Sequence, residues 1–144
     1  MEPKHLDENI AFLIGKASHL FYSRVTGAFR EKKIDVTVEQ FSILTILWYD
    51  DGLLQQEIAN RLNRDKTTLT RVINNMEKRN LVVRIPDKSD RRVNLIHLTY
   101  LGKELQKTLT ETTGNIYLKS IEGLSPDKLR HLVENLNTII NNLQ

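Results

Sequence analysis

Basic side chains are concentrated between residues 61 and 92, where their net charge exceeds that of the whole chain. This segment holds ten Lys or Arg against four Asp or Glu, a net of +6, whereas all 144 residues together carry only +3. The remainder of the chain is therefore mildly acidic. A basic segment on an acidic body is typical of a surface that binds nucleic-acid phosphates, because a generally adhesive protein would spread its positive charge.

The side chains that would read a nucleic acid lie on a helix predicted over residues 66–80. Its inward stripe repeats at i, i+3, i+4 and i+7 and consists of Leu69, Val72, Ile73 and Met76. The side chains left outward are Lys66, Thr67, Thr68, Thr70, Arg71, Asn74, Asn75 and Lys78. Hydroxyls bond phosphates or touch base edges, while Arg71 would fork onto guanine and Asn74 would pair with adenine. The alternative is an amphipathic helix whose polar face is incidental.

A second group of candidate residues lies on a predicted hairpin tip. Two segments rich in β-branched residues predict antiparallel strands around a polar loop, at 81–86 and 93–99. Arg92 on the tip would enter the minor groove of DNA, and Asp90 would orient its guanidinium. Lys88 and Arg91 would add attraction to phosphates. The alternative is an ordinary charged hairpin tip.

These two groups need a scaffold, and the surrounding sequence predicts one. Residues 55–62 form a short helix that braces the helix over 66–80. Between them, Asn63 suits a left-handed turn position, and Asp65 is placed to cap the second helix. In this helix-turn-helix arrangement the second helix lies in the major groove. With the hairpin beside it, the pattern predicts a winged helix-turn-helix.

Two further helices are predicted before this module and two after it. A long amphipathic helix runs from Leu6 to about Lys32, and Thr37 opens another with a capping box. The predicted inner face of that second helix is Phe41, Leu44, Thr45 and Trp48. Thr99 is placed to cap a helix reaching about Ile121, whose stripe is Leu101, Leu105, Leu109, Thr112 and Ile116. Ser125 caps the last helix, with proline in its first turn.

The predicted fold is therefore mainly α with a small β-hairpin wing. A winged helix-turn-helix DNA-binding domain spans residues 37–98, and a helical dimerisation region is formed by 1–36 with 99–144. The terminal helices carry about a dozen large aliphatic side chains, each worth roughly 1.5–3 kcal/mol when fully buried. Pairing across a two-fold axis would bury them. The alternative is a monomer in which both ends form an ordinary helical bundle.

Several classes of function are disfavoured by composition. The absence of cysteine excludes disulfides, thiolate catalysis and cysteine-based metal or redox sites. The four histidines, His5, His19, His97 and His131, are scattered without the spacing of metal ligands. The sequence has neither a glycine-rich phosphate loop nor a nucleophile–base pattern. We therefore expect no enzymatic activity, no metal site and no cofactor.

The chain also lacks the segments that would direct it to a membrane. No apolar run approaches the ~20 residues needed to span a bilayer. Its beginning, MEPKHLDEN, has no apolar secretory segment. We expect a cytoplasmic protein without a membrane partner.

Residues 55–99 resemble the winged-helix core of the MarR family of bacterial transcription regulators. The family's wing pattern, Asp-x-Arg-x5-Leu-Thr, is complete here as Asp90, Arg92, Leu98 and Thr99. Long flanking helices extend the resemblance over nearly the full chain. One departure is Leu54, which stands where many members have a Ser or Thr that caps the brace helix. Asp51 is the candidate to replace that cap.

The resemblance implies an obligate homodimer that binds a pseudo-palindromic site near a promoter. It also implies a crevice between the dimer helices and each DNA-binding lobe, through which small molecules relieve binding. The residues that would bind such an effector are left unassigned. We expect a sequence-specific regulator, and more specifically a repressor, that binds double-stranded DNA. The alternative is a winged-helix module that binds another protein, although such a face should carry apolar anchors rather than Thr, Arg, Asn and Lys.

Overall fold

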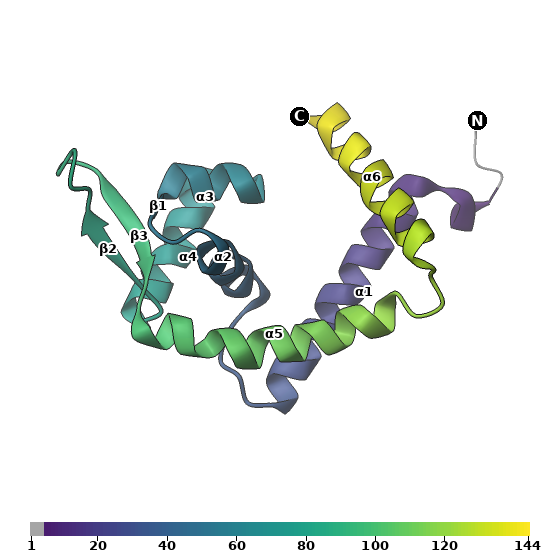
Figure 1. Ribbon diagram of the computed structural model, residues 1–144, viewed down its shortest axis with the longest axis horizontal. Coiled ribbons are helices and arrows are strands. Elements are labelled where there is room, and N and C mark those ends of the chain that lie inside the picture. The colour runs from purple at the N-terminus through teal and green to yellow at the C-terminus, as the bar shows by residue number, and fades with distance from the viewer. Residues whose placement is uncertain (1–4) are drawn as a thin grey trace.

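The computed structural model describes residues 5–144 as one helical molecule with a small sheet at one end. The hairpin and the short helices lie at that end, the first and last long helices lie at the other, and α5 runs between them (Figure 1). In chain order the elements are η1 (Leu6–Glu8), α1 (Ile10–Glu31), α2 (Val38–Tyr49), β1 (Leu53–Leu54), α3 (Gln55–Leu62), α4 (Lys66–Lys78), β2 (Val82–Pro86), β3 (Asn94–Leu98), α5 (Tyr100–Ser120) and α6 (Pro126–Leu143). The predicted fold class, a mainly helical winged helix-turn-helix, is confirmed.

The first long helix begins later than its sequence pattern predicts. Residues 6–8 form a separate 3₁₀ turn, and α1 starts at Ile10. The cause is local, because the Asn9 side chain accepts a hydrogen bond from the Phe12 backbone N–H at 3.0 Å. Asn9 therefore caps α1, and the helix predicted from Leu6 is corrected at its beginning.

The helix α2 lies at the centre of the hydrophobic core, and its predicted inner face is only partly right. Thr37 and Gln40 form the expected capping box. Leu44 is buried as predicted, but Phe41, Thr45 and Trp48 are half-buried. The side chains that are fully covered on this helix are Gln40, Ile43, Leu44 and Leu47. Because α2 is apolar around most of its circumference and neighbours pack on several sides, periodicity could not identify one inner face.

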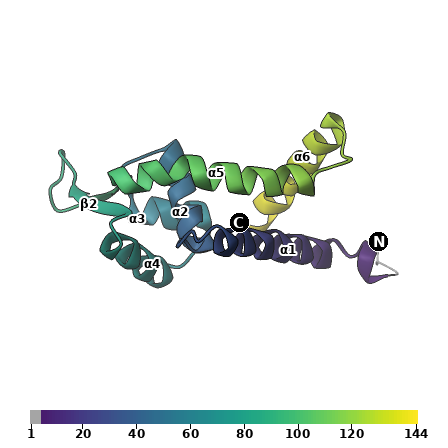
Figure 2. The same ribbon diagram turned by 90° about the horizontal axis from the view of Figure 1, so that it is seen from below.

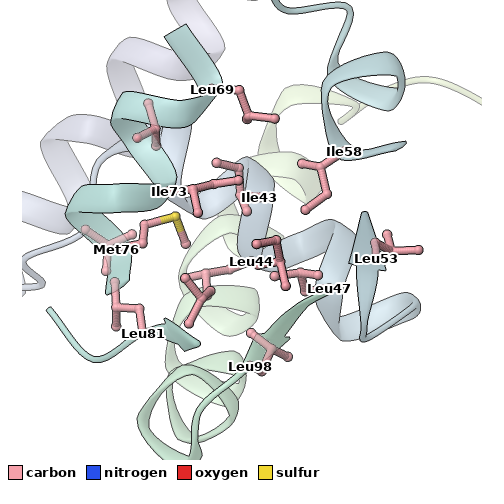
Figure 3. Close-up of a cluster of buried hydrophobic side chains, with 14 of the residues drawn as sticks. Ile43, Leu44, Leu47, Leu53, Ile58, Leu69, Ile73, Met76, Leu81 and Leu98 are labelled. Carbon is pink, nitrogen blue, oxygen red and sulfur yellow. The ribbon is translucent and has the colours of Figure 1, made fainter. Parts of the chain in front are cut away.

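The core joins α2 to the helix-turn-helix and to the base of the wing. Figure 3 shows aliphatic side chains from α2, α3, α4 and the sheet pointing toward one another. Ile58 and Ile73 are fully buried there, as is Met76. The predicted stripe of the second short helix therefore does face the core. This packing holds α4 by one side and leaves its other side outward.

The sheet has three antiparallel strands in the order β1-β3-β2. The predicted hairpin is present, with Val82 opposite Leu98 and Pro86 opposite Asn94. The short β1, where Leu53 pairs with Ile96, was not predicted, because two residues carry no periodicity. It follows Gly52, whose φ of +81° favours glycine, and an added Cβ would lie 2.5 Å from His97 Cε1, so the ring would have to move to admit a larger residue.

The helix α5 is joined to the wing at its first turn. Thr99 caps it as predicted, accepting a hydrogen bond from the Gly102 backbone N–H at 3.1 Å. The Trp48 indole donates to the Gly102 carbonyl at 3.0 Å. Along the predicted stripe, Leu109 and Thr112 are buried, whereas Leu101 remains 42% exposed. The stripe therefore begins one turn later than predicted.

The last helix, α6, is capped as expected but has no fully buried side chain within residues 5–144. Ser125 accepts from the Lys128 backbone N–H at 3.4 Å, and Pro126 stands at the first position. No other element packs extensively against α6 within residues 5–144. The large aliphatic side chains that it leaves exposed are Leu132, Val133, Leu136, Ile140 and Leu143.

Candidate nucleic-acid interface

The turn that sets α4 against α3 has the predicted geometry. Asn63 adopts a left-handed conformation with φ and ψ both at 48°. Asp65 accepts a hydrogen bond from the Thr68 backbone N–H at 2.8 Å and so caps α4. The side-chain and backbone hydrogen bonds from Thr68 hold the pKa of Asp65 below its usual 3.8. The caps and the turn thereby fix where α4 begins.

The outward face of α4 collects seven of its eight predicted residues in one shallow hollow. These are Lys66, Thr67, Thr70, Arg71, Asn74, Asn75 and Lys78. Thr68 is half-buried and lines a different hollow, together with Tyr22 of α1 and Val38 of α2. Successive helical residues are rotated by about 100°, so neighbouring threonines face different surroundings.

Most of the positive charge near this face is not neutralised within the protein. Four of the ten basic side chains between residues 61 and 92 form ion pairs: Arg61, Arg79, Arg84 and Arg92. The other six make no ion pair with any residue in the range 5–144, and they are Arg64, Lys66, Arg71, Lys78, Lys88 and Arg91. Three of these six, Lys66, Arg71 and Lys78, line the hollow along α4, and unpaired cationic charge attracts a polyanion.

The wing tip holds Arg92 in a defined direction, as predicted. Its Nε and Nη2 donate to the two oxygens of Asp90, at 3.0 and 3.1 Å. These bonds from Arg92 hold the pKa of Asp90 below its usual 3.8, so the carboxylate stays ionised. The Arg92 side chain is 91% exposed. Lys88 and Arg91 are exposed beside it. The hairpin projects from the same end of the molecule that carries α4 (Figure 2).

One interaction network between wing and helix was missed by the sequence interpretation. Arg84 on β2 pairs with Glu77 of α4, and its Nη2 also donates to Asn74 Oδ1 at 2.8 Å. Gln55 lies near the same guanidinium at 3.4 Å, and it donates to the Thr70 hydroxyl at 2.5 Å. The only available signal was a charged residue in the middle of an otherwise apolar strand.

A second network was also missed, and it contains a buried amide. Gln40 is 4% exposed, and its Nε2 donates to Asn75 Oδ1 at 2.8 Å. Its Oε1 accepts from Arg79 Nη1 at 2.8 Å. Arg79 is in turn paired with Asp35, at 2.7 Å, in the segment before α2. The sequence shows Gln40 only as a capping-box residue, because its partners lie far along the chain.

Two negative findings concern the residues that the structure describes. No group of three or more His, Asp or Glu side chains among residues 5–144 is arranged to hold a metal ion. In the same residues no helix is both long and apolar enough to cross a membrane.

Comparison with known proteins identifies the family to which this fold belongs. The model of the MarR family matches residues 36–93, which contain the helix-turn-helix and most of the wing. The HTH-type transcriptional regulator TtmR of Methylorubrum extorquens is 30% identical over 138 residues, covering 94% of this chain and 67% of that protein. The chain belongs to the MarR family.

Solved structures of MarR-family regulators share the whole fold. The MepR–DNA complex of Staphylococcus aureus is similar with a TM-score of 0.85 and 26% identity, over 96% of this chain and 99% of that one. CouR of Rhodococcus jostii RHA1, bound to p-coumaroyl-CoA, is similar with a TM-score of 0.86 and 24% identity, over 95% of each chain. This MarR-family chain is thus a DNA-binding transcriptional regulator with a winged-helix fold, and its similar proteins are regulators rather than enzymes.

The departure at Leu54 is compensated differently from the sequence expectation. The Glu57 carboxylate accepts a hydrogen bond from the Leu54 backbone N–H at 2.7 Å, which is half of a capping box. Asp51, the predicted cap, instead accepts from the Leu98 backbone N–H at 2.8 Å and lies 3.4 Å from His97 Nδ1. Asp51 therefore stabilises the end of β3 at the base of the wing. The prediction that it caps the brace helix is wrong.

Proposed function

We propose that this MarR-family regulator binds DNA as a homodimer, at a pseudo-palindromic duplex site, and represses transcription there. The observation that carries the proposal is the convergence of the outward face of α4 with the Arg92 tip at one end of the molecule. Unpaired cations supply attraction to phosphates, and fixed polar side chains supply base contacts. These contacts are sufficient for a repressor, because a protein bound at a promoter site excludes polymerase from it.

The proposed docking uses both predicted groups of residues. The helix α4 enters the major groove, and its contacts come from Lys66, Thr67, Thr68, Thr70, Arg71, Asn74, Asn75 and Lys78. Lys88, Arg91 and Arg92 of the wing lie along the flanking backbone, with Arg92 in the minor groove and Asp90 orienting it. Thr68 takes the least part, because it faces α1 and α2. The MepR–DNA complex supports this assignment at the level of the shared fold.

The proposed dimer rests on the exposed stripe of α6. Val133 is 58% exposed and Ile140 is 50% exposed on a helix that has no fully buried side chain within residues 5–144. An amphipathic helix is stable when its apolar face is covered, and a second copy supplies an equivalent face. Residues 1–36 and 99–144 would then form the dimerisation region and 37–98 the DNA-binding domain. The two α4 helices would lie about 34 Å apart, one turn of DNA.

Release by a small-molecule effector is the third part of the proposal. A hollow of about 280 Å³ lies between α1, α2 and α4, with Leu69 and Val72 of α4 in its wall. A ligand seated there would contact the back of the DNA-reading helix directly. CouR, which shares the fold, is described as bound to p-coumaroyl-CoA. The setting of all these events would be the bacterial cytoplasm.

Selection of bound duplexes from a random library, followed by footprinting, tests the proposal. We expect an enriched site with two inverted half-sites about one helical turn apart and protection of both grooves. Retention should weaken steeply as salt is raised, because counterions are released on binding. Absence of salt-sensitive retention of any duplex would contradict the proposed function. An enriched site without inverted symmetry would contradict the homodimer alone.

A further inference from the structure

The two asparagines of α4 both turn their amide oxygen toward the protein. Asn75 Oδ1 accepts a hydrogen bond from Gln40 Nε2, and Asn74 Oδ1 accepts one from Arg84 Nη2, each at 2.8 Å. Both asparagines are exposed and line the hollow along α4. The oxygen and nitrogen of an amide diverge from one planar carbon and point in different directions. An inward oxygen therefore leaves the NH2 group outward.

The orientation of Gln40 follows from its own partners. Its Oε1 accepts from the Thr37 backbone N–H at 3.1 Å and from Arg79 Nη1 at 2.8 Å. Both partners are donors only, so the oxygen rather than the nitrogen of the amide must face them. The Gln40 nitrogen is thereby directed at Asn75. Because Gln40 is buried, water cannot replace these bonds without cost.

The remaining outward groups have the same polarity. Lys66, Arg71 and Lys78 carry donors and no acceptor. The Thr70 hydroxyl donates to the Lys66 carbonyl at 2.7 Å and accepts from Gln55, so its proton is already used. Among the residues that line this hollow, only Thr67 has a hydroxyl that is free to act as either donor or acceptor. The face therefore offers donors along most of its length.

A donor-bearing face selects among base edges. In the major groove guanine offers two acceptors, N7 and O6, whereas the amino groups of adenine and cytosine are donors. We propose that Gln40 and Arg84 are positioning residues that hold Asn75 and Asn74 as hydrogen-bond donors, so that α4 prefers acceptor-rich edges, above all guanine. The inference rests on the proposed DNA binding. It also revises the expected pairing of Asn74 with adenine, which needs both ends of the amide outward.

The substitution Gln40→Glu tests this directly. The introduced carboxylate still accepts from Thr37 and Arg79, but it has no hydrogen to donate to Asn75. The Asn75 amide then rotates, its NH2 donates inward and its oxygen faces the groove. We expect the preference at one position of each half-site to move toward bases that present an amino group. The relative affinity should change about 2- to 10-fold, the range of a single hydrogen bond.

Two comparisons separate positioning from a general effect. Gln56→Glu is the matched control, because Gln56 also donates to an asparagine oxygen, that of Asn60 at 2.9 Å, but on α3. It should weaken binding to all sequences alike and leave base preference unchanged. In an Asn75→Ala background, Gln40→Glu should no longer alter base preference. Thermal unfolding shows whether each variant is folded.

A second variant keeps the inference testable if Gln40→Glu does not fold. Asn75→Asp is at an exposed position, and its carboxylate places an acceptor outward while Gln40 donates to the other oxygen. It should shift base preference in the same direction. If the wild-type protein selects sites, and Asn75→Asp and a folded Gln40→Glu select the same sites as the wild type, the positioning role is overturned. Wild-type protein that selects no site would instead contradict the proposed function.

Discussion

Side chains of one type have different surroundings on the face of α4, and the differences decide what each is able to contact. Thr70 has its hydroxyl engaged by Gln55 and the Lys66 carbonyl, whereas Thr68 is half-buried against α1 and α2. Arg71 forms no ion pair within residues 5–144. Its guanidinium is therefore free to fork onto a guanine edge.

Replacing Arg71 with Ala should cost about 1–3 kcal/mol of binding free energy and relax selectivity at one base position. The measurement is competition binding with duplexes substituted at each position in turn. Lys78→Ala is the matched control. Loss of an ammonium that contacts phosphate should weaken binding to all sequences uniformly and lower the salt slope by about one unit. Unchanged selectivity in Arg71→Ala would show that α4 is docked in another orientation.

Replacing Arg92 with Ala should weaken binding most where the site is flanked by A·T-rich steps. Their narrow minor groove concentrates negative potential, and Arg92 is aimed by two hydrogen bonds to Asp90. Affinities for A·T-flanked and G·C-flanked versions of one site measure the effect. Arg91→Ala, at an exposed neighbouring position that forms no ion pair with residues 5–144, should reduce both affinities equally. An equal loss from Arg92→Ala would argue against insertion in the groove.

At the scale of the elements, the wing is held to the core by backbone contacts at its base. Asp51 accepts from the Leu98 N–H, and the Thr99 hydroxyl donates to the Asn80 carbonyl at 2.6 Å. The first turn of α5 approaches the Leu81 backbone so closely that a Cβ on Gly102 would lie 2.3 Å from the Leu81 carbonyl oxygen. The direction of the wing thus depends on this close approach of two backbones.

Gly102→Ala should lower the free energy of unfolding by about 1–3 kcal/mol, because a backbone oxygen must move to admit the methyl group. Gly114→Ala is the matched control in the same helix, where no atom of residues 5–144 beyond the adjoining helix backbone lies within 4 Å of an added Cβ. That change should raise stability by about 0.5–1 kcal/mol through helix propensity. Urea unfolding measures both. Equal effects of the two substitutions would contradict the close contact.

Across the whole molecule, one end carries the surface that we propose to read DNA, and at the other end α6 packs extensively against no other element of residues 5–144. The hydrophobic core joins α2, α3, α4 and the sheet, whereas α6 leaves five large aliphatic side chains exposed. A monomer would present this stripe to water. In a homodimer the same stripe would set the distance between the two copies of α4 and thereby the spacing of half-sites.

Replacing Ile140 with Glu should shift the protein toward monomer at micromolar concentration and sharply reduce affinity for a two-half-site duplex. A charge in the apolar interface would lack a partner, and single-site binding loses the avidity of two linked modules. Asn141→Glu, on the polar side of α6, adds the same charge and should leave the dimer intact. Sedimentation velocity measures assembly. A wild-type monomer, or an unaffected Ile140→Glu dimer, would contradict the role of α6.

Local chemistry was enough to predict most of the elements and much of the candidate site. The bounds of α3 were predicted to the residue, and the caps at Thr37, Asp65, Thr99 and Ser125 are all present. So is the pairing of Asp90 with Arg92. These features depend on residues two to four positions apart, whose geometry is set by the backbone of a single helix or turn. Sequence spacing therefore carries the information.

Contacts between distant segments were decided only by the tertiary structure. Gln40 and Asn75 are 35 positions apart, and Gln55 reaches Thr70 across the turn between two helices. The burial of α2 on several sides and the pairing of β1 with β3 have the same origin. Helical periodicity predicted seven of the eight side chains assigned to the outward face of α4, and it placed only Thr68 wrongly. Which of their atoms are directed at a base depends on partners brought together by packing, because an inward hydrogen bond fixes the orientation of a polar side chain.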